Sequence, residues 1–205
     1  MKRTLINYLG LLGMVSLLSY TAAVIFSPLA YPDYHWLSQA VSDLSAEAAS
    51  SRTLWNQLSA LYMPCGIVCC TVNCIAVAGK YNKMLRLGVY LFALMNWVTA
   101  VGYAMFPLTD AGTPNGFQNI MHLVVTGAVV ALSILALVLM ICGGCFQRQC
   151  RSLGFWAGAA LFLMILGAVG VNLLPRAYFG LAERFSTFAA GFNAVLGIYL
   201  YNDFS

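Results

Sequence analysis

The sequence predicts an all-α integral membrane protein, a bundle of six transmembrane helices. Composition is the first observation behind this prediction. Of the 205 residues, 61% are apolar and only 8% are charged, and the mean hydropathy is +0.83. About a quarter of the residues in a soluble domain are charged, so this chain has too few charges to cover a surface in water. The composition therefore excludes a soluble enzyme, a nucleic-acid-binding protein and a disordered regulator.

The second observation is the length of the apolar stretches. A helix needs about 20 mostly apolar residues to cross ~30 Å of hydrocarbon. Six stretches qualify: Leu5–Leu29, Leu58–Ala78, Leu87–Pro107, Ile120–Ile141, Leu153–Leu174 and Ala182–Tyr201. The first five contain no charged residue, and the sixth has Glu183 and Arg184 at its edge. Their apolar residues are continuous rather than alternating, which disfavours a transmembrane β-barrel.

The first stretch resembles a signal peptide, because Lys2 and Arg3 precede its apolar residues. A cleavable apolar region is usually about 7–15 residues long, whereas this one continues to Leu29. We therefore expect a retained first helix. The whole chain, 1–205, is expected to form one transmembrane domain.

Prolines mark the predicted ends of the first, third and fifth spans. Pro28, Pro107 and Pro175 each stand at the border of a span, followed by a polar loop and a returning apolar stretch. Proline ends helices and begins turns. With short loops joining neighbouring helices, the pattern predicts three antiparallel hairpins.

The loop between the first two spans, Tyr31 to Gln57, is the longest. Pro32 and Asp33 indicate a helix start. Apolar residues then recur at four-residue spacing, opposite polar ones; the apolar set is Trp36, Ala40, Leu44 and Ala48, and the polar set is Gln39, Asp43 and Glu47. This pattern predicts a short amphipathic helix at the membrane interface or over the bundle mouth. The aromatic residues Tyr31, Tyr34, Trp36 and Trp55 are typical of an aromatic belt.

Basic residues in the short loops predict the orientation, because they favour the cytoplasmic side. With the N-terminus inside, seven basic residues are cytoplasmic: Lys2, Arg3, Lys80, Lys83, Arg86, Arg148 and Arg151. Three are outside: Arg52, Arg176 and Arg184. Both termini are then cytoplasmic, and the expected location is a plasma membrane. Membrane lipids are the expected partners of the basic loops, and no nucleic acid is expected.

Ionisable residues from all three predicted hairpins gather at the outer mouth. They are Asp43, Asp110, His122, Glu183 and Arg184, and Asn119 stands near His122. Charged groups within a membrane bundle are costly and often functional. We expect an outward-facing polar pocket that binds a lipid headgroup or a small polar ligand. If the pocket is catalytic, His122 is the candidate base, Asp110 or Asp43 would orient it, and Arg184 would hold an anionic group.

Other interpretations stay open, and whether the protein is an enzyme is undecided. A transporter or facilitator would use Asn96, Asn172 and Asn193 along a polar path, and a non-catalytic scaffold would use the outer charges only for pairing. Weaker alternatives are a zinc site at His35 and His122 with a carboxylate, and a redox pair at Cys142 and Cys145. No phosphate-binding or hydrolase motif is present. We expect no cofactor and no metal.

Short motifs across the chain resemble a known family. They are Ser27-Pro-Leu-Ala-Tyr-Pro-Asp-Tyr34, Ser42-Asp-Leu-Ser-Ala46, Phe106-Pro-Leu-Thr-Asp110 and the later His122. Together they are similar to the domain of unknown function 998 family, multi-pass membrane proteins mainly of bacteria and archaea. The resemblance implies a six-helix membrane bundle and a bacterial or archaeal membrane. It implies that Asp43, Asp110 and His122 belong to the family pattern, and it assigns them no catalytic role.

Overall fold

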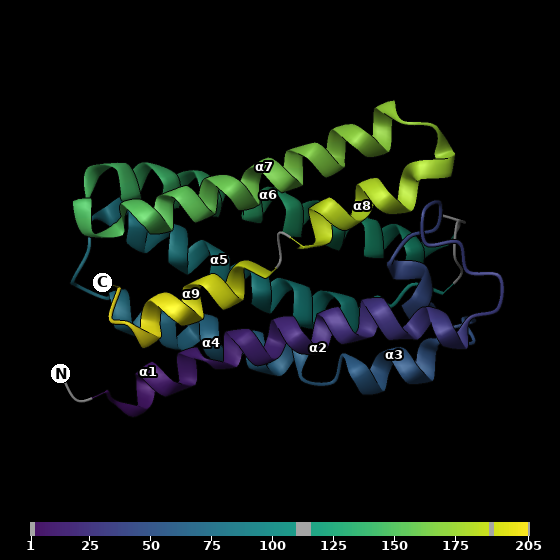
Figure 1. The fold of residues 1–205 in the computed structure, drawn as a ribbon, viewed down its shortest axis with the longest axis horizontal. Coiled ribbons are helices and arrows are strands. Elements are labelled where there is room, and N and C mark those ends of the chain that lie inside the picture. Colours follow the sequence, from purple (N-terminus) through teal and green to yellow (C-terminus); the bar gives the residue numbers. More distant parts are fainter. Residues whose placement is uncertain (1–2, 110–115, 189–190, 205) are drawn as a thin grey trace.

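In the computed structural model the chain is a bundle of helices (Figure 1), described for residues 3–109, 116–188 and 191–204. The helices are α1 (Leu5–Gly10), α2 (Leu12–Phe26), α3 (Arg52–Leu58), α4 (Tyr62–Val77), α5 (Lys83–Met105), α6 (Phe117–Phe146), α7 (Arg151–Leu173), α8 (Phe179–Phe188) and α9 (Phe192–Tyr201). Four short 3₁₀ helices join them: η1 (Ser27–Ala30), η2 (Ser42–Ser45), η3 (Arg148–Cys150) and η4 (Arg176–Tyr178). No strand occurs in these three ranges, which confirms the all-α class.

Five helical segments are long and apolar enough to cross a membrane: Leu5–Ala30, Arg52–Val77, Lys83–Met105, Phe117–Phe146 and Arg148–Leu173. They overlap the first five predicted spans, and the protein is an integral membrane protein. The sixth predicted span, Ala182–Tyr201, corresponds to two ten-residue helices, α8 and α9. Neither helix alone is long enough to cross the hydrocarbon layer.

The long axes of the helices lie roughly side by side (Figure 1). Helix α5 packs against α6, α6 against α7, and α7 against α8, while α9 contacts α1, α2, α4 and α7. The start of α1 and the end of α9 lie at one end of the bundle together with η3, and we name this the terminal end. Residues 31–58 and the starts of α6 and α8 form the other end, which we name the loop end.

The first two spans are each interrupted, for identifiable reasons. The interruption between α1 and α2 follows a close approach of α9, since a Cβ on Gly197 would clash with the Gly10 carbonyl oxygen. Between α3 and α4, Pro64 occupies the first turn of α4. A proline ring clashes with the carbonyl four residues earlier and provides no N–H, so α3 cannot continue into α4.

The predicted amphipathic helix in the first loop is wrong. Between Pro32 and Ala48 the chain forms turns and only the four-residue η2. Asp33, the expected helix start, has a φ of 62°, which is incompatible with an N-terminal cap of a helix. Between Pro32 and Ala48 the buried side chains are Val41, Leu44 and Ala46, so Leu44 is the one buried member of the expected four-residue series, and Trp36 is 53% exposed.

Candidate functional site

Side chains of α8 hold the first loop against the bundle. The Arg184 guanidinium donates hydrogen bonds to the Trp36 carbonyl at 2.5 Å and to the Tyr34 hydroxyl at 2.8 Å. It also donates to the Gly180 carbonyl at 2.7 Å and stands 3.4 Å from the Gln39 carbonyl. An arginine has five donors in a fixed fork, and here they bind backbone carbonyls of an irregular loop instead of a carboxylate.

Glu183 completes this attachment. Its Oε2 accepts a hydrogen bond from the Val41 N–H at 2.6 Å, and the Leu181 N–H donates to the Leu37 carbonyl at 3.0 Å. A Cβ on Gly180 would clash with the Gln39 carbonyl oxygen, so the loop lies directly on α8. Backbone polar groups that leave water need partners, and α8 provides several of them for the loop.

Asp43 lies in the same loop, half-buried. Its Oδ2 accepts a hydrogen bond from the Ala40 N–H at 3.1 Å. Burial raises the pKa of the Asp43 carboxyl above its usual value, and the Ala40 hydrogen bond partly offsets this. Tyr34, whose hydroxyl donates to the Ala40 carbonyl at 2.8 Å, has its pKa raised by burial against the opposing effect of Arg184. The Asp43 carboxyl and the Tyr34 hydroxyl are therefore both partly removed from water.

Glu183 is also the electrostatic neighbour of three tyrosine hydroxyls. They belong to Tyr20 of α2, Tyr34 of the loop and Tyr103 of α5, so they come from three separate parts of the chain. Among the residues described, Glu183 Oε1 has no hydrogen-bond partner, and no lysine or arginine forms an ion pair with Glu183. Sequence reasoning assigned Tyr34 only to the aromatic belt and did not single out Tyr20 or Tyr103, because a tyrosine near a span end is by default a belt residue.

His122 forms a second polar group at the loop end, between α5 and α6. Its ring is stacked on Tyr103 with centroids 4.8 Å apart, and its Nδ1 is 2.8 Å from the Phe106 carbonyl oxygen. The Tyr103 hydroxyl is 3.0 Å from the Thr126 hydroxyl, which donates to the His122 carbonyl. Within the described chain Nε2 has no hydrogen-bond partner. The Phe106 contact fixes the ring, because that nitrogen must carry the proton.

Asn119 lies one turn before His122 and is buried. Its Oδ1 accepts hydrogen bonds from the N–H and the hydroxyl of Thr109, at 3.1 and 2.9 Å. These bonds tie the start of α6 to the segment that follows α5. Asp110, the next residue of that segment and a predicted candidate, lies outside the described residues.

The structure brings together three of the predicted site residues, Asp43, Glu183 and Arg184, where the first loop meets α8. His122 lies on α6, and its link to this group is Tyr103, which stacks on His122 and is within electrostatic range of Glu183. In the three described ranges, no group of three His, Cys, Asp or Glu side chains is placed to hold a metal ion. The seven cysteines are all free thiols.

The asparagines of the transporter interpretation do not form one path. Asn193 of α9 donates to Asn96 of α5 at 3.0 Å, and the Cys70 thiol donates to Asn193 at 2.9 Å. Gly66 leaves room for this pair, since a Cβ there would stand 2.9 Å from Asn193 Nδ2. Asn172 is exposed on α7 and bonds only to the Ala168 carbonyl of its own helix. Asn96 and Asn193 thus form a packed interhelical contact.

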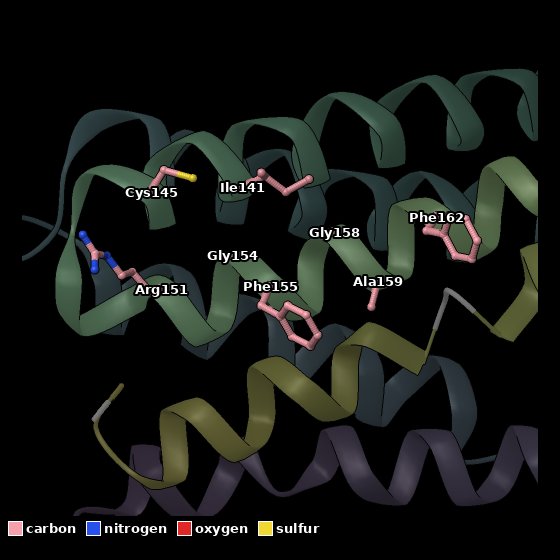
Figure 2. Close-up of a pocket in the computed structure, with 8 residues that line it drawn as sticks. All are labelled: Ile141, Cys145, Arg151, Gly154, Phe155, Gly158, Ala159 and Phe162. Atoms are coloured by element: carbon pink, nitrogen blue, oxygen red, sulfur yellow. The ribbon is translucent and has the colours of Figure 1, made fainter.

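Two cavities lie away from these side chains. One, of about 750 Å³, lies beside α6 and α7 near the terminal end, as Figure 2 shows. The other, of about 260 Å³, is an apolar cavity lined by α7 and α8. Neither is lined by Asp43, Asn119, His122, Glu183 or Arg184.

The comparisons with known proteins identify a family and no individual relative. A family model described as "Protein of unknown function (DUF998)" matches residues 14–197, which is most of the chain. No curated protein and no solved structure matches. The match confirms the resemblance noted from the sequence motifs. The chain belongs to the DUF998 family of membrane proteins.

Proposed function

We propose that the protein crosses the membrane six times, with α8 and α9 together as the sixth segment. The two helices have ten residues each and follow α7 in the chain. Six crossings put both termini on the same side, and the start of α1 and the end of α9 do lie at the same end of the bundle. The basic residues of that end favour the cytoplasm, so the loop end faces outward from a bacterial or archaeal plasma membrane.

The proposed function is binding of a lipid headgroup or a small polar ligand at the loop end. The observation that carries this proposal is Glu183, a half-buried carboxylate whose Oε2 binds the Val41 N–H and whose Oε1 has no hydrogen-bond partner in the described chain. Glu183 Oε1 can therefore accept a hydrogen bond from a ligand. A hydrogen bond to a charged group contributes about 1.5–3 kcal/mol.

The chemistry around Glu183 favours a ligand with a protonated amine. An ammonium group forms charge-assisted hydrogen bonds to a carboxylate, and aromatic rings attract cations. Tyr20, Tyr62 and Trp55 form an aromatic cluster, with the ring centroids of Tyr62 and Trp55 at 4.7 and 6.1 Å from that of Tyr20. Tyr20 is the member of this cluster within electrostatic range of Glu183. Arg184 is already bound to the loop, so an anionic group is a weaker fit than an amine. His122 would add a hydrogen bond from the α6 side.

The test compares Glu183→Gln with wild type, using two amine probes. Phosphatidylethanolamine in nanodiscs represents a lipid ligand, and phosphoethanolamine in solution represents a small ligand. We expect one probe to raise the melting temperature of wild type, and Glu183→Gln to weaken its binding at least about tenfold, the loss of one charge-assisted hydrogen bond. The amide oxygen of the substituted side chain still accepts a hydrogen bond from the Val41 N–H, so the loop stays attached.

Glu47→Gln is the matched control, because Glu47 is an exposed carboxylate of the same loop that pairs with Arg52 at 3.7 Å. It should bind either probe as wild type does. If neither probe stabilises wild type, or if Glu183→Gln and Glu47→Gln respond alike, the proposal is wrong. In that case the scaffold interpretation, in which these charges only hold the fold together, is favoured.

A further inference from the structure

The cavity beside α6 and α7 near the terminal end has a form unlike the site under the first loop. Figure 2 shows Arg151 and Cys145 at one end of it and Phe162 at the other. Gly154 and Gly158 lie between them on α7, and Phe155 stands beside the cavity. The lining is therefore apolar along its length, with one cation at its end.

Small residues on both helices make this hollow. A Cβ on Gly144 of α6 would stand 2.9 Å from the Gly154 Cα, so the two helices are in close contact at that point. Beyond it, a Cβ on Gly158 would meet no atom within 4 Å. The flanking Phe155 and Phe162 are 69% and 64% exposed. In a membrane protein, an apolar groove open at the helix surface faces acyl chains.

The length of the groove matches one leaflet. Residues 151 to 162 extend over about 16 Å at a rise of about 1.5 Å per residue. Half of a hydrocarbon layer of ~30 Å is about 15 Å. If Arg151 lies at the headgroup boundary, Phe162 lies near the bilayer centre, and one acyl chain fits between them.

The charges at the mouth of the groove select the headgroup. Arg151 and Arg148 are exposed, and neither makes a hydrogen bond or ion pair with another described residue. At this end of the described chain the carboxylate is Asp203, which forms no ion pair with either arginine. It accepts a hydrogen bond from the Asn7 side chain at 2.9 Å. Two cations without a partner in the described chain favour a phosphate, which arginine binds with paired hydrogen bonds.

We propose that this groove is a binding site for an anionic phospholipid of the leaflet at the terminal end. The phosphate would bind Arg151, supported by the charge of Arg148, and one acyl chain would lie along Gly154 and Gly158 against Phe155 and Phe162. This site is independent of the ligand site proposed at the loop end, because it uses other helices and the opposite charge.

Native mass spectrometry of the full chain in detergent can test the proposal with two probes of identical acyl chains, phosphatidylglycerol and phosphatidylcholine. Wild type should retain phosphatidylglycerol more strongly. Arg151→Gln should weaken phosphatidylglycerol binding about fivefold, the effect of one basic residue near a membrane surface, and leave phosphatidylcholine binding unchanged. Arg151 makes no contact that the fold needs, so this variant should fold normally.

A second variant tests the acyl-chain groove separately from the charge. A Cβ on Gly158 has free space around it, so Gly158→Leu should fill the groove and weaken the binding of both lipids. Two controls match these changes: Lys80→Gln removes an exposed charge of the same end, and Gly127→Leu adds the same side chain on α6, where a Cβ also meets nothing within 4 Å. Both controls should behave as wild type.

Three outcomes would overturn the proposal. The first is equal retention of the two lipids by wild type, which would mean occupation by any acyl chain or detergent. The second is the same phosphatidylglycerol affinity in Arg151→Gln and Lys80→Gln. The third is a Gly158→Leu variant that binds lipid as Gly127→Leu does, or that converts a dimer to a monomer, since the groove would then be a contact between two copies.

Discussion

The arginines on α8 at the loop end and on α7 at the terminal end have opposite surroundings. At the loop end, Glu183 and Arg184 are bonded to the backbone of the first loop, and Asp43 is bonded within it. At the terminal end, Arg148 and Arg151 are exposed and have no bonding partner in the described chain. The cause is loop length. A long irregular loop has many backbone groups without secondary-structure partners, and short turns have few.

This difference distinguishes charged side chains that hold the fold together from charged side chains that are free to bind a ligand. A cation that already binds carbonyls has little capacity left for a ligand, whereas an exposed arginine without a partner has all its donors available. The availability of donors and acceptors, more than the clustering of charge, therefore indicates where a ligand could bind. Glu183 Oε1 at the loop end and Arg151 at the terminal end are two groups that satisfy this condition.

Arg184→Ala should produce the largest effect. It removes the hydrogen bonds to the Trp36 carbonyl, the Gly180 carbonyl and the Tyr34 hydroxyl. Hydrogen bonds to charged groups contribute about 1.5–3 kcal/mol, and because these act together we expect a loss of about 3 kcal/mol. The free energy of unfolding from SDS titration measures it, and proteolysis should cut the loop faster.

The contrast between the ends predicts that Arg151→Ala leaves the free energy of unfolding unchanged. If the Arg151 variant is destabilised as much as the Arg184 variant, the distinction between engaged and available charge is wrong. Arg176→Ala, at an exposed arginine near the start of α8, is a second control and should also be neutral.

Gly180→Ala should be the next largest effect. Its Cβ would clash with the Gln39 carbonyl oxygen and stand 2.7 Å from that of Trp36, so the loop must move away from α8. Overpacking of this kind costs about 1–3 kcal/mol. Thermal unfolding in detergent, followed by circular dichroism, would show a lower melting temperature.

Gly158→Ala at the other end is the comparison for Gly180→Ala. A Cβ there meets nothing within 4 Å, and alanine favours a helix over glycine by up to about 1 kcal/mol. The melting temperature should stay equal or rise. Equal losses in both glycine variants would show that the loop does not depend on close contact with α8.

Much of the fold could be predicted from the sequence because the deciding signal is local. The predicted spans Leu87–Pro107 and Ile120–Ile141 overlap α5 and α6, since the length of an apolar stretch alone determines whether a helix can cross a membrane. The helix ends differ by up to five residues. Prediction failed for the first loop, where Asp33 has a positive φ and the partners Glu183 and Arg184 lie far away in the sequence, on α8.

The sequence identified which residues belong to the candidate site, but it did not predict how their side chains contact one another. Charged residues near span ends identified Glu183, Arg184, Asp43 and His122 as polar groups of one end. No sequence pattern indicates that Arg184 binds carbonyls instead of a carboxylate, because carbonyl partners carry no residue-type signal. Tyr20 was missed for a related reason, since a tyrosine within an apolar stretch has the same appearance whether it faces lipid or, as here, is buried in the bundle.

His122→Phe should have a smaller effect than either change at α8. Phenylalanine keeps a ring to stack on Tyr103 and loses the hydrogen bond between Nδ1 and the Phe106 carbonyl. One hydrogen bond of this kind contributes about 1 kcal/mol, and we expect that loss in the free energy of unfolding. A loss of about 3 kcal/mol or more, as expected for Arg184→Ala, would mean that His122 holds the loop end together as Arg184 does.

Asp43→Asn should give the smallest effect, and its sign depends on pH. Burial raises the pKa of Asp43 above 3.8, so the fold favours the protonated form. The stability that Asp43 contributes is then greatest at low pH and is lost as the pH rises through the folded-state pKa. At neutral pH Asp43→Asn should be more stable than wild type, by less than about 0.5 kcal/mol because solvent screens a half-exposed group. The difference should vanish in acid below the ordinary carboxyl pKa. A destabilised Asp43→Asn at neutral pH would show that the charge itself is needed to bind the Ala40 N–H.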